Sequence, residues 1–349
     1  MIDEKKKIKT IYGTIEVSKK ALLGQMSHSF SISPYLQEKM LYIGQKEVFS
    51  QGSETFENLL QLKVCSSQIQ RICLYYGTLS ETEDIIKTAH PSQETDVDSV
   101  LYAQVDGSNI PTEKGWKEVK LGRIFSEGDL KTKVSVYQGV AGRTNIEKSD
   151  YLACKGNNLE FINDFEVLLN DRLSQNHKEV VFITDGETWI DNWLEENYNQ
   201  YPRILDYYHA VKPLKDFANK AISDEKRKEW LDQQIIFLLS SQTQLLLSEV
   251  DKIENLSNLA QTAKKDLKRY YKNNEHRIDY ASYRLKGWAI GSGAIESAHR
   301  VVIQKRMKLC GQRWGKNAQP MLNLRAINKS KKWSEIIQLV NLKSFAKAA

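Results

Sequence analysis

Two short apolar segments, each followed by an Asp-Gly pair, most constrain how this chain can fold. Residues 99–105 (SVLYAQV) run into Asp106, residues 179–184 (EVVFIT) run into Asp185, and a glycine follows each aspartate. Apolar, β-branched runs of this length are typical of strands buried in a sheet. The pattern therefore predicts two buried strands that each deliver a carboxylate at one end. Ordinary turn chemistry is the competing interpretation of either pair taken alone.

The elements around these two segments follow a recognisable order. Alternating residues at 116–125 and 133–140 predict two antiparallel strands, residues 159–169 and 189–198 predict helices, and residues 203–209 predict a short fifth strand or strand-like segment. Three strands followed by a helix, a strand, a helix and a strand is the order of a ribonuclease-H-like mixed sheet covered by helices. The first and fourth strands are neighbours in that topology, so both aspartates can meet at one edge of the sheet.

Helical regions are predicted on both sides of this α/β core. Residues 214–286 contain neither Gly nor Pro and carry recurring apolar clusters, which predicts two or three helices inserted into the core. We divide the chain into an N-terminal β-hairpin region (1–36), a helical, helix-turn-helix-like region with a linker (37–98), the first part of the catalytic core (99–211), an all-α insertion (212–286), the last part of the core (287–330) and a C-terminal helix (331–349).

A helix-turn-helix candidate lies in the N-terminal region. Residues 53–61 and 68–76 predict two helices joined by a short link. Gln68, Gln70 and Arg71, at the start of the second helix, are side-chain types that read base edges. A plain three-helix packing domain explains the same pattern equally well.

Glu296 is the last acidic residue before a long basic segment. It falls in the first turn of a helix predicted after the Gly-Ser-Gly sequence at 291–293, and the next acidic residue is Glu335. A glutamate that stabilises the helix dipole on a solvated helix is the simple interpretation. A metal-binding carboxylate beside a nucleic-acid surface is the more specific one.

Asp106, Asp185 and Glu296 can together form a three-carboxylate site. Three carboxylates in one cleft do not all stay ionised without cations. Mg²⁺ suits such a site because it binds carboxylates and substrate phosphates while it keeps several waters. Two ions about 3.5–4 Å apart clamp the attacking and leaving oxygens of a phosphodiester. We therefore expect two Mg²⁺ ions, for which Mn²⁺ can substitute.

Five sequence blocks carry a resemblance to a known family. They are VDGSNIPT (105–112), GWKEVKLGRIF (115–125), FITDGETWI (182–190), ILDYYHAVKPL (204–214) and GSGAIESAHRVVIQKRMKLCGQRW (291–314). Over roughly residues 35–330 the chain resembles the ISKra family of bacterial insertion-sequence transposases, which are DDE enzymes related to the Mutator-like group. The resemblance implies that Asp106, Asp185 and Glu296 are the catalytic, metal-binding triad of a ribonuclease-H-like core with an α-helical insertion.

The resemblance also implies roles for residues around the triad. Asp206 and His209 look like a D-x-x-H motif, in which His209 braces the active-site edge or contacts DNA; a purely structural histidine is the alternative. Arg313 and Trp314 resemble the family's Arg-Trp pair, for which phosphate contact and stacking are expected, with core packing of Trp314 equally favoured. The DNA contacts expected after the glutamate are Arg300, Lys305, Arg306, Lys308, Arg313 and Trp314.

The expected function is that of a transposase that uses Mg²⁺ to cleave and transfer DNA strands at insertion-sequence ends. Its partners would be double-stranded DNA, namely terminal inverted repeats and target DNA, bound by a homodimer or higher oligomer. The formal net charge of +6 fits a polyanion partner because the basic residues are clustered. The alternatives are a domesticated DNA-binding or regulatory protein that keeps the fold, and a structure-selective DNA nuclease.

The cysteines and the apolar segments bear on location. The four cysteines contain no CxxC pair, so neither a zinc site nor a disulfide framework is expected. The sequence has no apolar run of membrane-spanning length and no secretion signal at its N-terminus. We expect a cytoplasmic, nucleoid-associated protein with no membrane partner.

Overall fold

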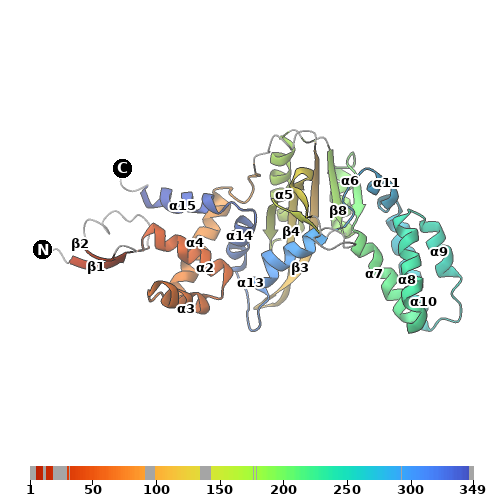
Figure 1. The fold of residues 1–349 in the computed structure, drawn as a ribbon, viewed down its shortest axis with the longest axis horizontal. Coiled ribbons are helices and arrows are strands. Elements are labelled where there is room, and N and C mark those ends of the chain that lie inside the picture. The colour runs from red at the N-terminus through yellow and green to blue at the C-terminus, as the bar shows by residue number, and fades with distance from the viewer. Residues whose placement is uncertain are drawn as a thin grey trace.

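A central sheet with a helical region at each end gives the molecule an elongated shape (Figure 1). The structure is a computed structural model. It describes residues 5–10, 13–18, 30, 32–90, 99–133, 143–175, 177, 179–291 and 293–345. Both the first and the last described helices lie at the same end of the molecule, and the helices of residues 207–285 lie at the other end.

The sheet has five strands in the order β7-β4-β3-β8-β9. Their bounds are β3 (Val100–Thr112), β4 (Gly115–Ser126), β7 (Asp150–Cys154), β8 (Glu179–Thr184) and β9 (Arg203–Leu205). β4 pairs antiparallel with both β3 and β7, whereas β8 runs parallel to β3 and to β9. The mixed α/β sheet expected from the sequence is therefore confirmed.

The first strand is longer than the sequence predicts. β3 continues through Asp106 as far as Thr112 and forms a long hairpin with β4, whose turn lies between Thr112 and Gly115. The prediction that Asp106 ends this strand is therefore wrong. The hairpin extends beyond the point where β8 stops pairing, so Asp106 is the first residue of β3 that no longer has β8 beside it.

The third strand of the sheet is not the predicted one. The segment 133–140 lies outside the described residues except for its first residue, which ends β5 (Leu130–Lys133). β5 pairs with β6 (Arg143–Ile146) in a separate two-stranded sheet. The third strand is β7, whose five residues are too few to show a clear alternation.

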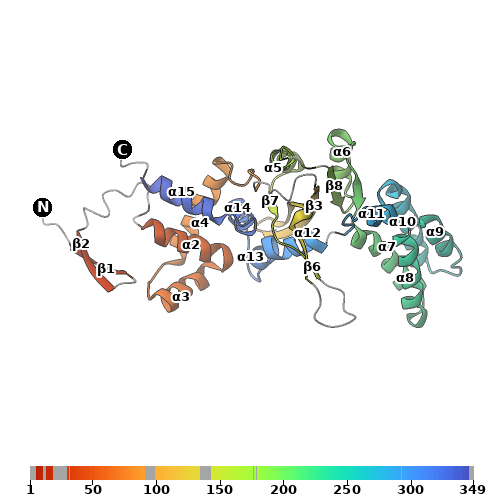
Figure 2. The same ribbon diagram turned by 45° about the horizontal axis from the view of Figure 1, so that its top comes forward.

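Helices cover both faces of the sheet. α5 (Asn158–Leu173) and α6 (Thr188–Asn197) share an apolar core with Leu101, Ala103 and Val105 of β3. The opposite face packs against a helix made of α12 (Gly293–Ala298), η4 (His299–Gln304) and α13 (Lys305–Met307). Figure 2 shows α5 and α12 on opposite sides of the strands.

The helix from Gly293 to Met307 contains a π-helical turn in its middle, the segment η4. Such turns bond residue i to i+5 and change the phase of the helix. Arg325, which is buried, donates hydrogen bonds to the carbonyl oxygens of Val301 and Val302 in this turn. The same guanidinium donates to the carbonyl oxygen of Gln45 at 2.5 Å. The pKa of Arg325 is lowered to about 10, mainly by burial and to a smaller extent by the positive charge of Arg306.

The N-terminal part consists of a hairpin and three helices, as predicted. β1 (Lys5–Thr10) and β2 (Gly13–Ser18) pair antiparallel. The helices are α2 (Pro34–Lys46), α3 (Phe49–Leu60) and α4 (Ser66–Thr82). They share one apolar core with α14 (Ala318–Lys329) and α15 (Trp333–Phe345) near the C-terminus. Residues from the two ends of the chain therefore stabilise each other.

The region between the two parts of the core forms a helical arm. It contains α7 (Tyr207–Ala221), α8 (Asp224–Leu239), α9 (Thr243–Asp251), α10 (Asn258–Asn273) and α11 (Tyr280–Leu285). The all-helical prediction is confirmed, but the stretch is divided more finely than the two or three helices expected. Ser241 and Asn255 adopt φ of 57° and 55° at the breaks, so turns form there without the glycine that usually marks them.

Across the residues that the structure describes, no helix is both long enough and apolar enough to cross a membrane.

Close packing between the two ends of the chain depends on Gly77. A Cβ atom at this position of α4 would lie 2.2 Å from the carbonyl oxygen of Pro320 in α14. The Asn323 side chain spans the same crossing, since its Nδ2 donates to the carbonyl oxygen of Gly77 and to the Glu81 carboxylate, both at 3.0 Å.

We expect Gly77→Ala to lower the free energy of unfolding by about 1–3 kcal/mol, because the overpacking outweighs the roughly 1 kcal/mol that Ala gains in a helix. Denaturant unfolding measures the change. Thr78→Ala is the matched control, since Thr78 is exposed on the next position of α4 and should change stability by less than about 0.5 kcal/mol. A Gly77→Ala protein as stable as the wild type would contradict the close crossing.

Candidate active site

Asp106 and Asp185 occupy equivalent positions on neighbouring parallel strands. Val105 and Thr184 form the last pair between β3 and β8, and each aspartate is the next residue of its strand. Backbones of paired strands lie about 4.8 Å apart, so the register brings the two residues side by side. Val105 packs toward α5 and α6, so Asp106 lies on the opposite face, where α12 packs.

Asp185 is an unusually basic carboxylate. Its pKa is raised to about 6, mainly by burial and to a smaller extent by the negative charges of Glu187 and Asp106. The backbone N–H of Glu187, which donates to Asp185 Oδ1 at 3.1 Å, and the His209 ring lower it. The influence of Asp106 on Asp185 means that the two carboxylates lie close enough to repel each other.

The glycine after Asp185 is required by the backbone and by a buried arginine. Gly186 has φ of +90°, which L-residues with a Cβ rarely adopt. A Cβ there would also lie 3.0 Å from Nη2 of Arg277. Arg277 is buried, donates to Thr184 Oγ1 at 3.4 Å and pairs with Asp191. The Asp185-Gly186 pair thus forms a sharp turn around this guanidinium.

Asp206 and His209 form a helix cap rather than part of a strand. β9 ends at Leu205 and α7 begins at Tyr207, so the predicted strand over 203–209 is wrong beyond its first three residues. The buried Asp206 carboxylate accepts the backbone N–H groups of Tyr208 (3.3 Å) and His209 (3.2 Å), and His209 Nδ1 lies 2.5 Å from its Oδ2. Asp is a favoured N-cap residue for this reason.

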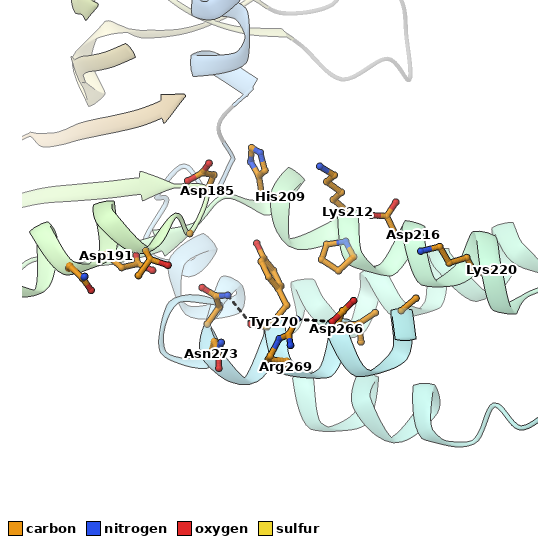
Figure 3. A pocket seen from close by; sticks show the side chains of 17 residues that line it. Asp185, Asp191, His209, Lys212, Asp216, Lys220, Asp266, Arg269, Tyr270 and Asn273 are labelled. Atoms are coloured by element: carbon orange, nitrogen blue, oxygen red, sulfur yellow. Dashed lines mark hydrogen bonds and ion pairs between the residues drawn. The ribbon is translucent and has the colours of Figure 1, made fainter. Parts of the chain in front are cut away.

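His209 faces the aspartates from the first turn of α7. Its hydrogen bond to Asp206 raises its pKa, burial lowers it, and the negative charges of Asp206, Asp185 and Asp106 raise it again. The net shift is upward, so the imidazole holds its proton to a higher pH than a free histidine. The ring lies beside Asp185 in the first turn of α7 (Figure 3).

The chain returns from the helical arm directly beside this cap. The backbone N–H of Tyr207 donates to the carbonyl oxygen of Ile290 at 2.9 Å. A Cβ on Gly291 would lie 3.0 Å from the Tyr208 ring, so a glycine at this position lets the returning segment pass close to α7. Two residues later α12 begins, and it packs against β3 and β4.

His299 connects this returning helix to the aspartates. Its Nε2 lies 3.1 Å from Asp106 Oδ2, and its side chain is almost fully buried. Neither ring nitrogen makes a well-aligned hydrogen bond to another described residue. Glu296 lies one turn earlier on the same helix and is exposed. In the described part of the chain, no three His, Cys, Asp or Glu side chains come close enough together to hold a metal ion. The three-carboxylate site stays a prediction.

A groove of about 670 Å³ leads away from Asp185 along the helical arm (Figure 3). One wall is α7, with His209, Lys212 and Asp216, and the other is α10. Tyr270 points from α10 into the groove (Figure 3). Burial is the main cause that raises the pKa of Tyr270 above its ordinary value, and the negative charge of Asp185 raises it as well. The groove makes Asp185 reachable from solvent.

The donor set fits a hard divalent cation. Asp106 in β3 and Asp185 directly after β8 supply carboxylate oxygens, and Mg²⁺ binds such oxygens together with waters and phosphate groups. Two neighbouring carboxylates repel each other, and the negative charge of Asp106 adds to burial, the main cause, in raising the pKa of Asp185. A cation held between them would remove that repulsion.

The helix-turn-helix candidate has the predicted helices, and its three singled-out residues differ in environment. The Gln68 side chain caps its own helix, since its Oε1 accepts the backbone N–H of Cys65 at 3.4 Å. Gln70 lines a cavity beside Arg313. Arg71 is exposed, with its guanidinium 4.9 Å from the centre of the Phe30 ring. Gln70 and Arg71 thus remain open to a ligand.

Among the basic residues after Glu296, Arg300, Lys305 and Arg313 are exposed as predicted. Lys308 is half-buried and donates to Ser108 Oγ at 2.7 Å, and burial lowers its pKa. Its ammonium group therefore lies beside β3, two residues along from Asp106.

The expected DNA contacts of Arg306 and Trp314 are wrong, because both side chains lie in the core. Arg306 is 1% exposed, donates to the carbonyl oxygen of Gly44 at 3.2 Å and lies over the rings of Phe49 and Trp314. Burial lowers its pKa to about 10. Trp314 is 7% exposed and its Nε1 donates to the carbonyl oxygen of Met307 at 3.0 Å. Neither side chain is available to a DNA phosphate or base, which favours the packing interpretation of Trp314.

Sequence reasoning missed His299, Glu187 and the lining of the groove. His299 follows Glu296 by three residues on one predicted helix, and that i, i+3 spacing is the signal that could have identified it. Glu187 follows the Asp-Gly turn, and its influence on Asp185 depends on the turn conformation. The groove joins helices far apart in sequence, for which no local pattern exists.

Comparison with known protein families finds no family model that matches this chain, and no curated protein matches it.

We expect Asp206→Asn to lower the pKa of His209, because Asn caps a helix as well as Asp does but carries no charge. NMR titration of the His209 ring measures the shift. Asp279→Asn is the matched control, since Asp279 caps α11 and accepts from the backbone N–H of Ser282. It should leave the His209 titration unchanged. An unaltered His209 pKa in Asp206→Asn would contradict the pairing.

We expect Asp185→Asn to stabilise the metal-free protein at neutral pH by about 3 kcal/mol. The folded-state pKa of about 6 exceeds the ordinary value of 3.8, so the native state binds this proton more tightly than the unfolded state. The free energy of unfolding then falls as pH rises through the window between these two values. The free energy of unfolding of the variant should not decrease over this pH window, as measured by denaturant unfolding in EDTA. Asp232→Asn, at an exposed position of α8, should keep it.

Proposed function

We propose that this protein is a DDE transposase that cleaves and transfers DNA strands with the help of divalent metal ions. The observation that carries the proposal is the placement of Asp106 and Asp185 side by side at the end of the parallel pairing between β3 and β8. Their mutual repulsion makes them a natural cation site. The sequence resemblance to insertion-sequence transposases points to the same two residues.

The topology supports a ribonuclease-H-like core. Numbered along the chain, the strands of the sheet lie in the order third, second, first, fourth, fifth, with the second antiparallel to its neighbours. Helices cover both faces, and the helical arm enters after the fifth strand. This is the arrangement expected when the first and fourth strands supply the acidic residues.

Each residue of the site would have a defined task. Asp106 and Asp185 would hold Mg²⁺ with Glu296 as a third carboxylate, and the bound ions would supply Lewis-acid activation of a water or 3′-hydroxyl and stabilise the leaving oxygen. His209 holds its proton beside Asp185 and can donate it in a hydrogen bond to a phosphate oxygen. Asp206 fixes the orientation of that ring. His299, whose Nε2 lies 3.1 Å from Asp106 Oδ2, would help to position that carboxylate.

DNA would reach this site from the face that carries α12. Exposed Arg300 and Lys305 lie on or next to the Glu296 helix, and Lys308 lies beside β3. Contacts of this kind neutralise phosphates and make binding depend steeply on salt. Two protein copies would be needed to bring two DNA ends together, so we expect a dimer or larger assembly on DNA.

The decisive experiment uses Mg²⁺ and duplex DNA made from the sequences that flank the gene, where the proposal expects terminal inverted repeats. We expect Asp106→Asn, Asp185→Asn and Glu296→Gln each to reduce strand cleavage by at least about a thousandfold, while binding to the same DNA stays within a few-fold of wild type. Glu229→Gln, at an exposed position of α8, is the matched control and should cleave normally.

The products separate the alternatives. Joined strands identify a transposase, and cleavage of branched DNA without joining identifies a nuclease. If Glu296→Gln cleaves as well as wild type while both aspartate variants are inactive, the glutamate is not part of the site.

A further inference from the structure

Two cavities meet where the β3–β4 hairpin touches the loop before α14. One, of about 530 Å³, lies beside the hairpin tip, and the other, of about 310 Å³, extends toward α3 and Gln70 of α4. Both are lined by Glu113, Trp314 and Gly315. The two cavities are therefore adjacent, and we call them together the hairpin groove. It is separate from the groove at Asp185, which shares none of its lining residues.

Positive charge dominates the hairpin groove. Lys114, Lys117 and Lys316 are exposed along it, and Lys155 is half-buried. The fifth lysine of the lining, Lys120, is buried, and its Nζ lies 3.0 Å from the carboxylate of Glu118, so these two charges offset each other. Glu113 is the one other acidic residue in the lining of the two cavities. At the end near α4, Arg313 adds a further exposed cation.

Backbone bonds fix the walls of the groove. The N–H of Trp314 donates to the carbonyl oxygen of Pro111 at 3.0 Å, which ties the loop to the end of β3. Lys155 Nζ donates to the carbonyl oxygen of Gly315 at 2.9 Å. A Cβ on Gly315 would lie 3.1 Å from the Glu113 carboxylate, so the hairpin turn and the loop approach closely there. The lysines consequently project from a rigid surface.

An exposed aromatic ring lies on the same hairpin as the lysines. Trp116 is 65% exposed and directly precedes Lys117 in β4, outside the lining of the two cavities. An uncharged ring at this position can add van der Waals contact with a nucleic acid bound along the hairpin.

We propose that the hairpin groove binds the phosphate backbone of double-stranded DNA. This inference rests on the proposed function, for which it supplies a second DNA contact outside the carboxylate site. β3 leads from Asp106 to the hairpin turn at Thr112, which is about 20 Å at roughly 3.3 Å per residue. That distance corresponds to about six base-pair steps of 3.4 Å. One duplex can therefore contact the hairpin groove while a phosphodiester about half a helical turn away lies near Asp106.

The groove also connects the active-site hairpin to the helix-turn-helix candidate. Gln70 and Arg313 line its far end, and Gln70 is a side-chain type that reads base edges. Phosphate contacts from lysines set the position of a duplex, while a residue such as Gln70 can contact its bases.

The test is a binding measurement that requires no catalysis. Fluorescence anisotropy with a 30-base-pair duplex in EDTA compares wild type with the double variant Lys114→Gln and Lys117→Gln. We expect the variant to bind at least about tenfold more weakly at 100 mM salt and its log–log salt slope to fall by about 2, one for each lost phosphate contact. The melting temperature should not change, since both side chains are exposed.

The matched control removes the same charge elsewhere. Lys226 and Lys228 are exposed on α8 in the helical arm, and their replacement by Gln should leave the affinity and the salt slope unchanged. Trp116→Ala should weaken binding with no change in the salt slope, because it removes an uncharged contact. Unchanged binding by the double lysine variant would overturn the proposal, and so would tighter binding of an RNA duplex of equal length.

This outcome is independent of the catalytic proposal. If Asp106→Asn cleaves DNA normally and the lysine variant still loses affinity, the carboxylate mechanism fails and the hairpin groove stands. If cleavage depends on Asp106 and the lysine variant binds normally, the carboxylate mechanism stands and the proposal for the hairpin groove fails.

Discussion

The point at which β3 and β8 stop pairing determines where Asp106 and Asp185 come together. Hydrogen bonding ends at Val105 and Thr184, and beyond that pair the two strands diverge, β3 into a long hairpin and β8 into a turn at Gly186. Each strand is followed or continued by an aspartate at the point where the two diverge. The cap of α7, the return of the chain before α12 and the groove along the arm all lie around this one edge.

Three buried arginines form hydrogen bonds between segments that are distant in sequence, at this edge of the sheet and in the neighbouring core. Arg277 supports the turn after Asp185, while Arg306 and Arg325 lie in the core shared by the two ends of the chain. Arg306 and Arg325 donate to backbone carbonyl oxygens rather than to carboxylates. Burial lowers the pKa of both, which reflects the cost of keeping a cation away from water. Their hydrogen bonds to carbonyl groups offset that cost, and they join segments distant in sequence.

The sequence predicts the parts of this structure that depend on local patterns. β8, α5, α6 and the β1–β2 hairpin lie where periodicity and turn residues place them. β7 was missed because five residues show too little alternation, and the start of α7 was missed because Asp206 caps a helix that begins within an aromatic, strand-like segment. For the site, the two aspartates follow from strand order, but the contact between His299 and Asp106 depends on how α12 is rotated.

The rotation of that helix also explains why Arg306 is buried although it was expected on the surface. The buried positions of the helix include Ile295, His299, Ile303 and Met307, which recur every four residues. An ordinary α-helix would move such positions steadily around its axis, whereas the π turn at 299–304 keeps them on one side. Arg306, next to Met307, is carried into the core with them. No composition rule identifies a π turn, so this change of phase was not predictable.

The guanidinium of Arg325 has a mechanical consequence. It donates hydrogen bonds to the carbonyl oxygens of Val301 and Val302, in the middle of the helix that carries Glu296. It also donates to the carbonyl oxygen of Gln45 at the end of α2, next to the helix-turn-helix candidate. A displacement of α2 therefore either breaks these hydrogen bonds or moves that helix with it. The position of α2 is thus coupled to that of the helix that carries Glu296 through one buried side chain.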